Sequence, residues 1–342
     1  MMGKTHLLGK TPEELSALSV SLGLPKYTGG QIARWLYVRR VFSIDDMTDI
    51  SLAGRAALKE GCESGLLRPS EVQVSSDGTK KYLFPVGEGS SVEAVMIPDG
   101  ERRTLCVSSQ SGCRMGCRFC ATGRQGYRGS LSASAILSQF LSVDEASELT
   151  NAVFMGMGEP LDNYDEVMRA IEVLTAPWGF AWSPKRITLS TIGVLPRLRE
   201  FIERSHCHLA ISLHNPFPEE RAEIMPVEKA YPVTEVVRLV RKADFSGQRR
   251  VSFEYTMFEG LNDSPRHCEA LARLLRGIEC RVNLIRFHSI PEFPHKPSSQ
   301  KVMESFRDSL SAKGITCTIR ASRGEDILAA CGLLAGTRAS RA

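Results

Sequence analysis

From about residue 100 onward, segments typical of β-strands alternate with segments typical of α-helices. The strand-like runs are 104–109, 151–156, 186–191, 208–213, 250–257, 281–287 and 315–320. The segments between them that have helical length and period include 132–146, 163–175, 233–243, 264–277 and 299–312. This alternation predicts a parallel sheet covered by helices, and the number of units favours a partial or complete β/α barrel over an open sheet.

The first hundred residues follow a different pattern. Apolar residues recur at helical spacing in 11–22 and 30–38, which predicts a small helical domain. Short strand-like runs on either side of Asp77-Gly78 predict a β-rich stretch with a turn at that dipeptide. The expected parts of the chain are a helical domain (1–60), a β-rich connector (61–98), the barrel (99–325) and a C-terminal segment (326–342).

Composition and charge narrow the function classes only slightly. Hydrophobic residues make up 42% and charged residues 24%, as in ordinary globular proteins. No apolar run is long enough to cross a membrane, so we expect a cytoplasmic protein without a membrane partner. The net charge of +4 is small, but residues 101–130 hold six arginines against Glu101 alone. That run is either a solvated arginine face or a rim that meets RNA phosphates.

The cysteines carry the strongest chemical signal. Three of the ten are spaced Cys113-x-x-x-Cys117-x-x-Cys120. Three thiolates can hold a 4Fe-4S cluster and leave one iron open for the amino and carboxylate groups of S-adenosylmethionine (SAM). A structural zinc ion with Cys106 as fourth ligand is the alternative. Because Cys106 is expected on a strand, seven residues upstream, the spacing favours the cluster.

Other reactive or polar residues fall where a barrel places its chemistry, at the carboxyl ends of the strands. The cysteine loop follows the first strand-like run of the predicted barrel. The others end or follow the second, third, fourth and sixth runs, and they are Gly158, Glu159, Ser190, Ser212, His214 and His288. We therefore expect them to converge at one end of the sheet.

Longer strings around these residues resemble the RlmN and Cfr family of radical SAM RNA methyltransferases, and they are nearer to its RlmN members. The strings are Cys106-Val-Ser-Ser-Gln-Ser-Gly-Cys113, Val153-Phe-Met-Gly-Met-Gly-Glu-Pro160, Ile187-Thr-Leu-Ser-Thr191 and Arg323-Gly-Glu-Asp-Ile-Leu-Ala-Ala-Cys331-Gly. The likeness extends over nearly the whole chain. It implies an α/β fold, a radical SAM partial (β/α)6 barrel of the TIM type, with a small N-terminal helical domain that docks RNA.

The resemblance also implies an activity. RlmN members methylate carbon 2 of an adenine in 23S rRNA, and many also modify the adenine 3′ of the anticodon in some tRNAs. The implied cofactors are one 4Fe-4S cluster and two SAM molecules per turnover, with an electron donor such as flavodoxin or ferredoxin, and a monomer suffices. Methylation of carbon 8, as in Cfr members, is one alternative. The other is a non-catalytic RNA-binding module with a structural zinc site.

The family roles transfer residue by residue. The cluster ligands would be Cys113, Cys117 and Cys120. The catalytic residues would be Cys331 as methyl carrier, Cys106 as its thiol partner and Glu93 as proton acceptor. The SAM contacts would be Gly158, Glu159, Ser190, Ser212, Leu213, His214 and His288, the last of which stands where much of the family has Asn. Without the resemblance, Cys331 would be interpreted as a packed residue of an apolar run and Glu93 as a surface carboxylate on a strand.

Two cysteines are needed because carbon 2 of adenine is not nucleophilic. In the implied route, one SAM methylates Cys331 and a second yields a radical that takes a hydrogen atom from the S-methyl group. The resulting methylene radical adds to the ring carbon, and Glu93 accepts the ring proton. Cys106 then attacks the sulfur of Cys331, which releases methylated RNA and leaves a disulfide for a thiol reductant.

Overall fold

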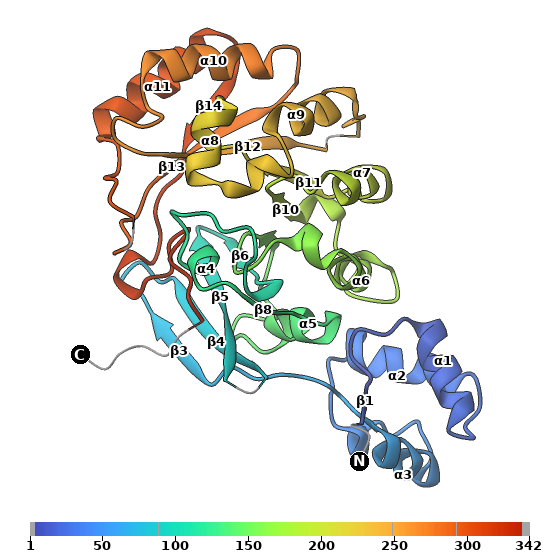
Figure 1. Ribbon diagram of the computed structural model, residues 1–342. Coiled ribbons are helices and arrows are strands. Elements are labelled where there is room, and N and C mark those ends of the chain that lie inside the picture. The colour runs from blue at the N-terminus through green and yellow to red at the C-terminus, as the bar shows by residue number, and fades with distance from the viewer. Residues whose placement is uncertain (1–3, 88, 248, 292, 337–342) are drawn as a thin grey trace.

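The computed structural model describes residues 4–336, except for residues 88, 248 and 292 (Figure 1). The described chain is built on a ten-stranded mixed sheet in the spatial order β14-β13-β12-β11-β10-β9-β6-β5-β4-β3. Within it, seven neighbouring strands run parallel, and they are β6 (Arg102–Cys106), β9 (Asn151–Phe154), β10 (Ile187–Thr191), β11 (His208–Ser212), β12 (Val251–Met257), β13 (Arg281–Arg286) and β14 (Thr316–Ile319). Since β14 and β3 lie at opposite edges, the barrel is partial.

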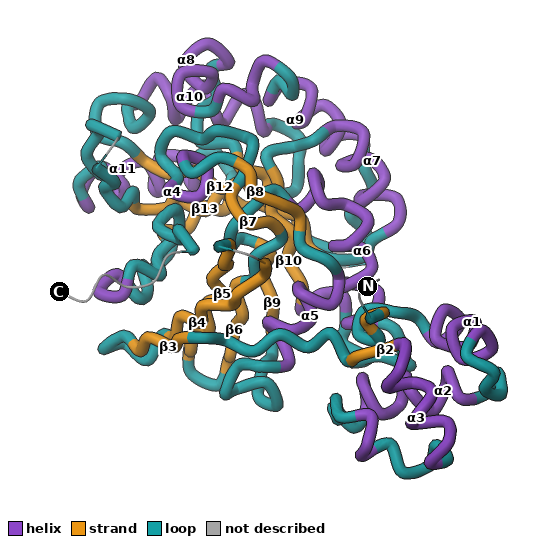
Figure 2. Tube along the Cα trace, turned by 60° about the horizontal axis from the view of Figure 1, so that its bottom comes forward, coloured by secondary structure: helices purple, strands orange, loops and turns teal. Residues whose placement is uncertain are grey.

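Helices connect the parallel strands and cover the outer face of the sheet (Figure 2). They are α5 (Ala133–Leu141), α6 (Tyr164–Thr175), α7 (Leu195–Arg204), α8 (Pro218–Ile224), α9 (Val233–Lys242), α10 (Pro265–Leu275) and α11 (Gln300–Ala312). In α9 the buried residues are Val233, Val236, Val237 and Val240, which share one helical face. The described elements thus form six strand–helix units followed by β14, which confirms the predicted partial (β/α)6 barrel.

Three antiparallel strands extend the sheet beyond β6. They are β5 (Ser90–Asp99), β4 (Lys80–Gly87) and β3 (Glu71–Val74). The turn between β3 and β4 contains Gly78 at a φ of 83°, and the side chain of Asp77 accepts a 2.9 Å hydrogen bond from Thr79 N. Because β5 pairs directly with β6, the connector strands bring Glu93 into the same sheet as Cys106.

The N-terminal helices form a lobe set apart at one end of the molecule (Figure 1). They are α1 (Pro12–Ser21), α2 (Thr28–Ala33), a π-helical turn (Arg34–Val38) and α3 (Leu52–Gly61), beside the short strands β1 (Thr5–His6) and β2 (Cys62–Glu63). Thr11 and Glu14 form a reciprocal capping box at the start of α1. The lobe meets the barrel near α6, where Arg169 pairs with Glu14 at 3.0 Å.

A polar cluster surrounds the start of α10. Ser264 occupies the N-cap position of α10, but its side chain makes no capping hydrogen bond to the helix backbone. Its hydroxyl lies 2.7 Å from Nδ1 of His267 instead, and Nε2 of the same ring lies 2.7 Å from Glu220. The hydroxyl therefore belongs to a polar cluster that joins α8 to α10.

Every helix in the described chain is too short or too polar to cross a bilayer.

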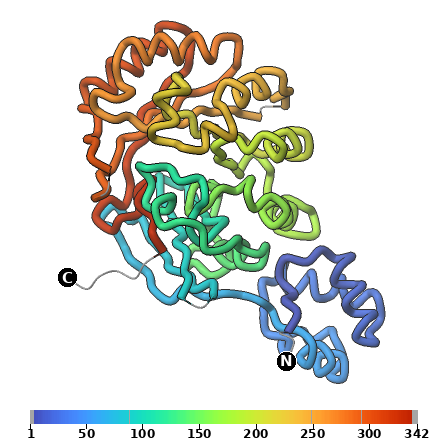
Figure 3. Tube along the Cα trace, in the orientation of Figure 1, coloured from blue at the N-terminus to red at the C-terminus, as the bar shows by residue number. Residues whose placement is uncertain are grey.

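After β14 the chain returns to the connector strands. Figure 3 shows this last segment, in red, lying between β3–β5 and the short helix α4 (Ala121–Arg124) that follows the cysteine loop. Of the predicted C-terminal segment, residues 337–342 lie outside the described residues. The described part carries Cys331, so its path decides where that thiol lies.

Candidate active site

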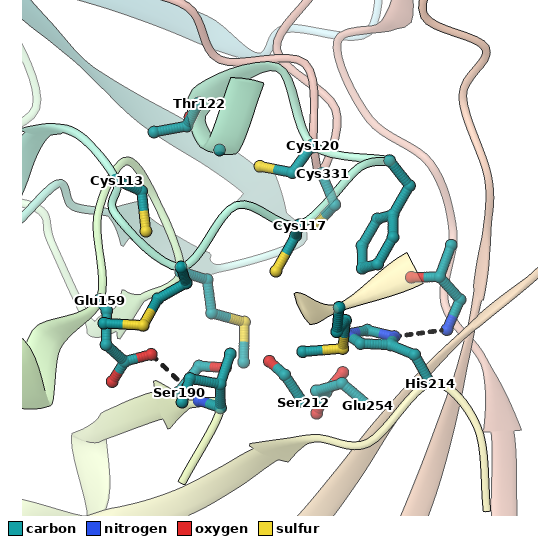
Figure 4. Close-up of a pocket in the computed structure, with 18 of the residues that line it drawn as sticks. Cys113, Cys117, Cys120, Thr122, Glu159, Ser190, Ser212, His214, Glu254 and Cys331 are labelled. Atoms are coloured by element: carbon teal, nitrogen blue, oxygen red, sulfur yellow. Dashed lines mark hydrogen bonds between the residues drawn. The ribbon is translucent and has the colours of Figure 1, made fainter. Parts of the chain in front are cut away.

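The three motif cysteines face one another across a cavity at the carboxyl end of the parallel strands (Figure 4). Their loop is flanked by β7 (Gln110–Gly112) and β8 (Tyr127–Ser130), which pair as a small antiparallel sheet. Gly112, at a φ of 71°, allows this close crossing, because a Cβ there would overlap the carbonyl oxygen of Gly126. The local sequence therefore folds the loop so that all three side chains line one space.

The cysteine environment suits a bound cluster. Burial raises the pKa of Cys113 to about 12 and holds the pKa of Cys117 and Cys120 above the usual value. Buried thiols of this kind become thiolates when an iron centre binds them, and three soft sulfur donors suit an iron–sulfur cluster. Cys106, which a zinc site would need, lines a second cavity instead. In the described residues no three His, Cys, Asp or Glu side chains are placed to bind one metal ion, so the fit concerns a cluster in which each of the three thiolates binds a different iron.

The predicted SAM contacts are mostly gathered here. Those that line the cysteine cavity are Gly158, Glu159, Ser190, Ser212 and His214. Leu213 is fully buried and lines neither cavity. Its backbone N already donates to Glu254 O at 3.0 Å and its backbone O accepts from Arg221 Nε at 2.9 Å, so the structure does not bring it together with the other predicted contacts. His288 lines the second cavity, and its Nε2 lies 3.1 Å from Ser322 Oγ.

Glu159 ties two strand ends together. Its Oε1 accepts hydrogen bonds from Thr191 Oγ1 at 2.6 Å and Leu161 N at 3.0 Å, and its Oε2 accepts one from Ile192 N at 3.0 Å. Burial raises the pKa of this carboxyl to about 7. Gly158 precedes it at a φ of 97°, where a Cβ would come within 2.5 Å of Gln110. A cationic ligand group at this point would favour the ionised carboxylate.

His214 is held as a neutral hydrogen-bond donor. Its Nδ1 accepts a 3.0 Å hydrogen bond from Thr256 N, so the ring proton belongs on Nε2. Burial lowers the pKa of His214 to about 3, which keeps the ring uncharged at neutral pH. The ring also packs edge-on against Phe119 with centroids 5.0 Å apart. The loop after β11 therefore presents a fixed donor beside the cysteine loop.

The second cavity brings Cys106 and Cys331 together. Both thiols line it, and burial, followed by the nearby Cys331 thiol, raises the pKa of Cys106 to about 12. The two cavities are contiguous, and the residues that line both are Cys120, Thr122, Met155, Gly156, Ile285, Arg320, Cys331 and Gly332. The predicted thiol pair thus lies directly beside the predicted cluster site. Cys331 is exposed, so its interpretation as a packed residue is wrong.

Two charged residues of the site were missed by the sequence analysis. Arg320 lines both cavities, and the adjacent Cys331 thiol is the main cause that raises its pKa. Its guanidinium lies 3.4 Å from Glu254, a buried carboxylate of β12 that also lines the first cavity. The signal was present in β12, because an acidic residue inside an apolar strand is rarely buried without a partner.

Glu93 is buried, so its interpretation as a surface carboxylate is wrong. Its Oε1 pairs with Lys81 Nζ at 3.2 Å, and its Oε2 accepts hydrogen bonds from Ala335 N at 2.7 Å and Gly336 N at 3.0 Å. It lines neither cavity. In this structure the carboxylate therefore lies behind the segment that carries Cys331.

Two family models match the chain. Residues 107–273 match the radical SAM superfamily, and residues 5–63 match the ribosomal RNA large subunit methyltransferase N-terminal domain. The partial barrel, the three-cysteine loop and this match define a radical SAM enzyme. Such enzymes hold a 4Fe-4S cluster and SAM, and the residues of the first cavity fit both groups.

Similar proteins identify the family. A Porphyromonas gingivalis protein named as a probable dual-specificity RNA methyltransferase RlmN is 58% identical over 336 residues, which is 98% of this chain and 95% of the relative. A Syntrophus aciditrophicus protein with the name dual-specificity RNA methyltransferase RlmN is 42% identical over 339 residues, covering 98% and 97%. The crystal structure of a radical SAM methyltransferase from Sphaerobacter thermophilus superposes with a TM-score of 0.91 at 38% identity, covering 97% and 100%. The chain belongs to the RlmN family of radical SAM methyltransferases.

Proposed function

We propose that the protein methylates carbon 2 of an adenine in 23S rRNA and of the adenine 3′ of the anticodon in some tRNAs. The names of its relatives support an RNA substrate and two specificities. The observation that carries the proposal is the neighbouring pair Cys106 and Cys331 in a cavity contiguous with the cysteine loop. Methylation of a non-nucleophilic ring carbon needs such a pair, one thiol to carry the methyl group and one to release the product.

The site residues divide the work. Cys113, Cys117 and Cys120 would hold the cluster, and the remaining lining residues of the first cavity would bind SAM. When bound, the cluster and SAM together supply one-electron cleavage of the sulfonium and so a radical that can remove hydrogen from a methyl group. The proposed contacts are the backbone at Gly158-Glu159, the hydroxyls of Ser190 and Ser212, and the Nε2 donor of His214.

The chain's own residues then act in sequence. Cys331 accepts a methyl group, loses a hydrogen atom from it and bonds through that carbon to the adenine. Glu93 accepts the ring proton, which requires its contacts with Ala335 and Gly336 to loosen, because Oε2 is already occupied. The adduct radical also gives up one electron, which the cluster would take back, and so becomes a closed-shell thioether. The Cys106 thiolate then attacks the sulfur of Cys331, the bond from that sulfur to the CH2 carbon breaks, the carbon takes up a proton to become the methyl group, and a disulfide forms. This scheme consumes two SAM molecules per methylated adenine, and it needs an electron donor such as flavodoxin or ferredoxin.

Nucleoside mass spectrometry tests the proposal. Protein reconstituted without oxygen would be incubated with 23S rRNA fragments or tRNA, SAM and reduced flavodoxin. We expect 2-methyladenosine, with one S-adenosylhomocysteine and one 5′-deoxyadenosine formed per product. 8-Methyladenosine would instead establish the carbon-8 activity of Cfr members. Absence of both products from cluster-loaded protein would refute the proposed function.

A further inference from the structure

A buried ion pair lies beneath the segment that carries Cys331. Lys81 of β4 and Glu93 of β5 are 3.2 Å apart, and only 9% and 3% of their side chains are exposed. Lys81 is paired in the antiparallel ladder with Val95, so it is a diagonal neighbour of Glu93 on the sheet. Desolvation offsets most of the attraction within such a pair, so net stability does not explain its presence.

The remaining contacts of both partners reach the same segment on either side of Cys331. Glu93 accepts the amide hydrogen bonds of Ala335 and Gly336 at 2.7 and 3.0 Å, beyond the cysteine. Lys81 Nζ lies 3.5 Å from the carbonyl oxygen of Leu328, before the cysteine. Leu328 adopts a φ of 53°, which a leucine rarely adopts, so this end of the segment needs external contacts to hold it. The pair therefore fixes both ends of the loop 328–336.

The helix α4, which follows the cysteine loop, contacts the other side of the loop 328–336. Ala121 N donates to the Gly332 carbonyl at 2.8 Å, and Thr122 Oγ1 donates to the Leu334 carbonyl at 2.7 Å. Ala121 directly follows Cys120. The loop 328–336 is thus hydrogen-bonded to α4 on one side and to the Lys81–Glu93 ion pair on the other. Loss of either set of hydrogen bonds would let Cys331 shift away from Cys106.

We propose that Lys81 is a positioning residue for the methyl carrier. Through Glu93 and Leu328 it fixes the loop 328–336, so that Cys331 stays beside Cys106 and faces the SAM cavity. This inference rests on the proposed function, in which Cys331 accepts the first methyl group. A displacement of about 1 Å in a reacting group can slow a reaction about 100-fold, so the attachment has a measurable effect.

Two measurements on the cluster-loaded, full-length chain test this role. The first is the rate of methyl transfer from SAM to Cys331 without RNA, followed by mass spectrometry of the Cys331 peptide. The second is hydrogen exchange of the Ala335 and Gly336 amides. In Lys81→Met we expect methyl transfer about 10- to 100-fold slower at saturating SAM, unchanged SAM affinity and faster exchange. Lys81→Arg should restore most of both, because it keeps the charge.

Lys80→Met is the matched control. Lys80 is adjacent on β4, but it pairs with Asp144 at 2.9 Å and Glu145 at 2.7 Å, away from the Cys331 loop. It should behave like the wild type. Because an unpaired buried Glu93 can prevent folding, Lys81→Met/Glu93→Leu provides a variant without buried charge, and it should show the same slow transfer and fast exchange.

The possible results distinguish failure of the positioning role of Lys81 from failure of the proposed S-methylcysteine route. Wild-type transfer rates in the double variant, or in a folded Lys81→Met, would overturn the positioning role whatever the exchange shows. Equal slowing by Lys80→Met would overturn it as well. If wild-type protein never methylates Cys331, the S-methylcysteine route fails, and unchanged exchange in the variants would then reject the attachment separately.

Discussion

Replacing Cys106 with alanine should make the protein accumulate as a covalent adduct with its RNA. Cys106 lines the second cavity, outside the proposed cluster site, and Cys331 would remain available to carry the methyl group. Methyl loading and bond formation to adenine should therefore proceed. Release should fail, because no thiolate is left to attack the sulfur of Cys331. The variant should accumulate one covalently bound RNA per active chain.

The structure also gives the pH dependence of release in the wild type. Burial is the main cause that raises the pKa of Cys106 to about 12, and methylation of Cys331 does not remove that cause. Methylation removes only the smaller contribution of the Cys331 thiol, so the thiolate stays a small minority of Cys106 between pH 7 and pH 9. Because only the thiolate attacks, release should accelerate about tenfold per pH unit over this interval. Arg320 lowers the pKa of Cys106, so Arg320→Leu should slow release further at each pH.

A denaturing gel with labelled RNA measures both effects. The Cys106→Ala adduct should survive denaturant and disappear with nuclease, whereas Cys331→Ala and the double variant should form none. Single-turnover decay of the wild-type adduct, followed from pH 7 to pH 9, gives the slope. Normal turnover by Cys106→Ala would reject the disulfide-release mechanism. A flat pH profile would show that a different step, or a different proton acceptor, controls release.

Three further predictions concern the cluster and RNA binding. Protein made without oxygen should contain about four iron and four sulfide per chain, and Cys113→Ala, Cys117→Ala or Cys120→Ala should lose them and all activity; stoichiometric zinc without sulfide would contradict the assignment. Arg124→Ala/Arg128→Ala should weaken binding to all RNA sequences and reduce the slope of log affinity against log salt by about 1 per lost phosphate contact, and equal slopes would mark a solvated face. Deletion of residues 1–60 should weaken RNA binding and leave iron content unchanged, whereas unchanged affinity would reject the docking role of the lobe.

The sequence determined the elements and the chemistry that are encoded locally. Apolar periodicity located every strand of the barrel, because side-chain alternation depends only on neighbouring residues. The cysteine loop was equally predictable, since Cys113, Cys117 and Cys120 lie within eight consecutive residues. Residues at strand ends were expected to converge, because parallel strands present their carboxyl ends at one edge, and Gly158, Ser190 and His214 do line one cavity.

Tertiary structure alone decided the contacts between distant segments. Glu93 accepts a hydrogen bond from Ala335, which lies 242 residues later in the sequence. No local sequence pattern predicts which strand the C-terminal segment will contact. The same holds for Arg320 beside Glu254, and for His288, which lies with the thiol pair. The Glu93 contact depends on the packing of β5 against the end of the chain, and the other two depend on the pairing of β12, β13 and β14. The sequence therefore indicated Cys106 and Cys331 through a family likeness, and only the folded chain placed these two cysteines in one cavity.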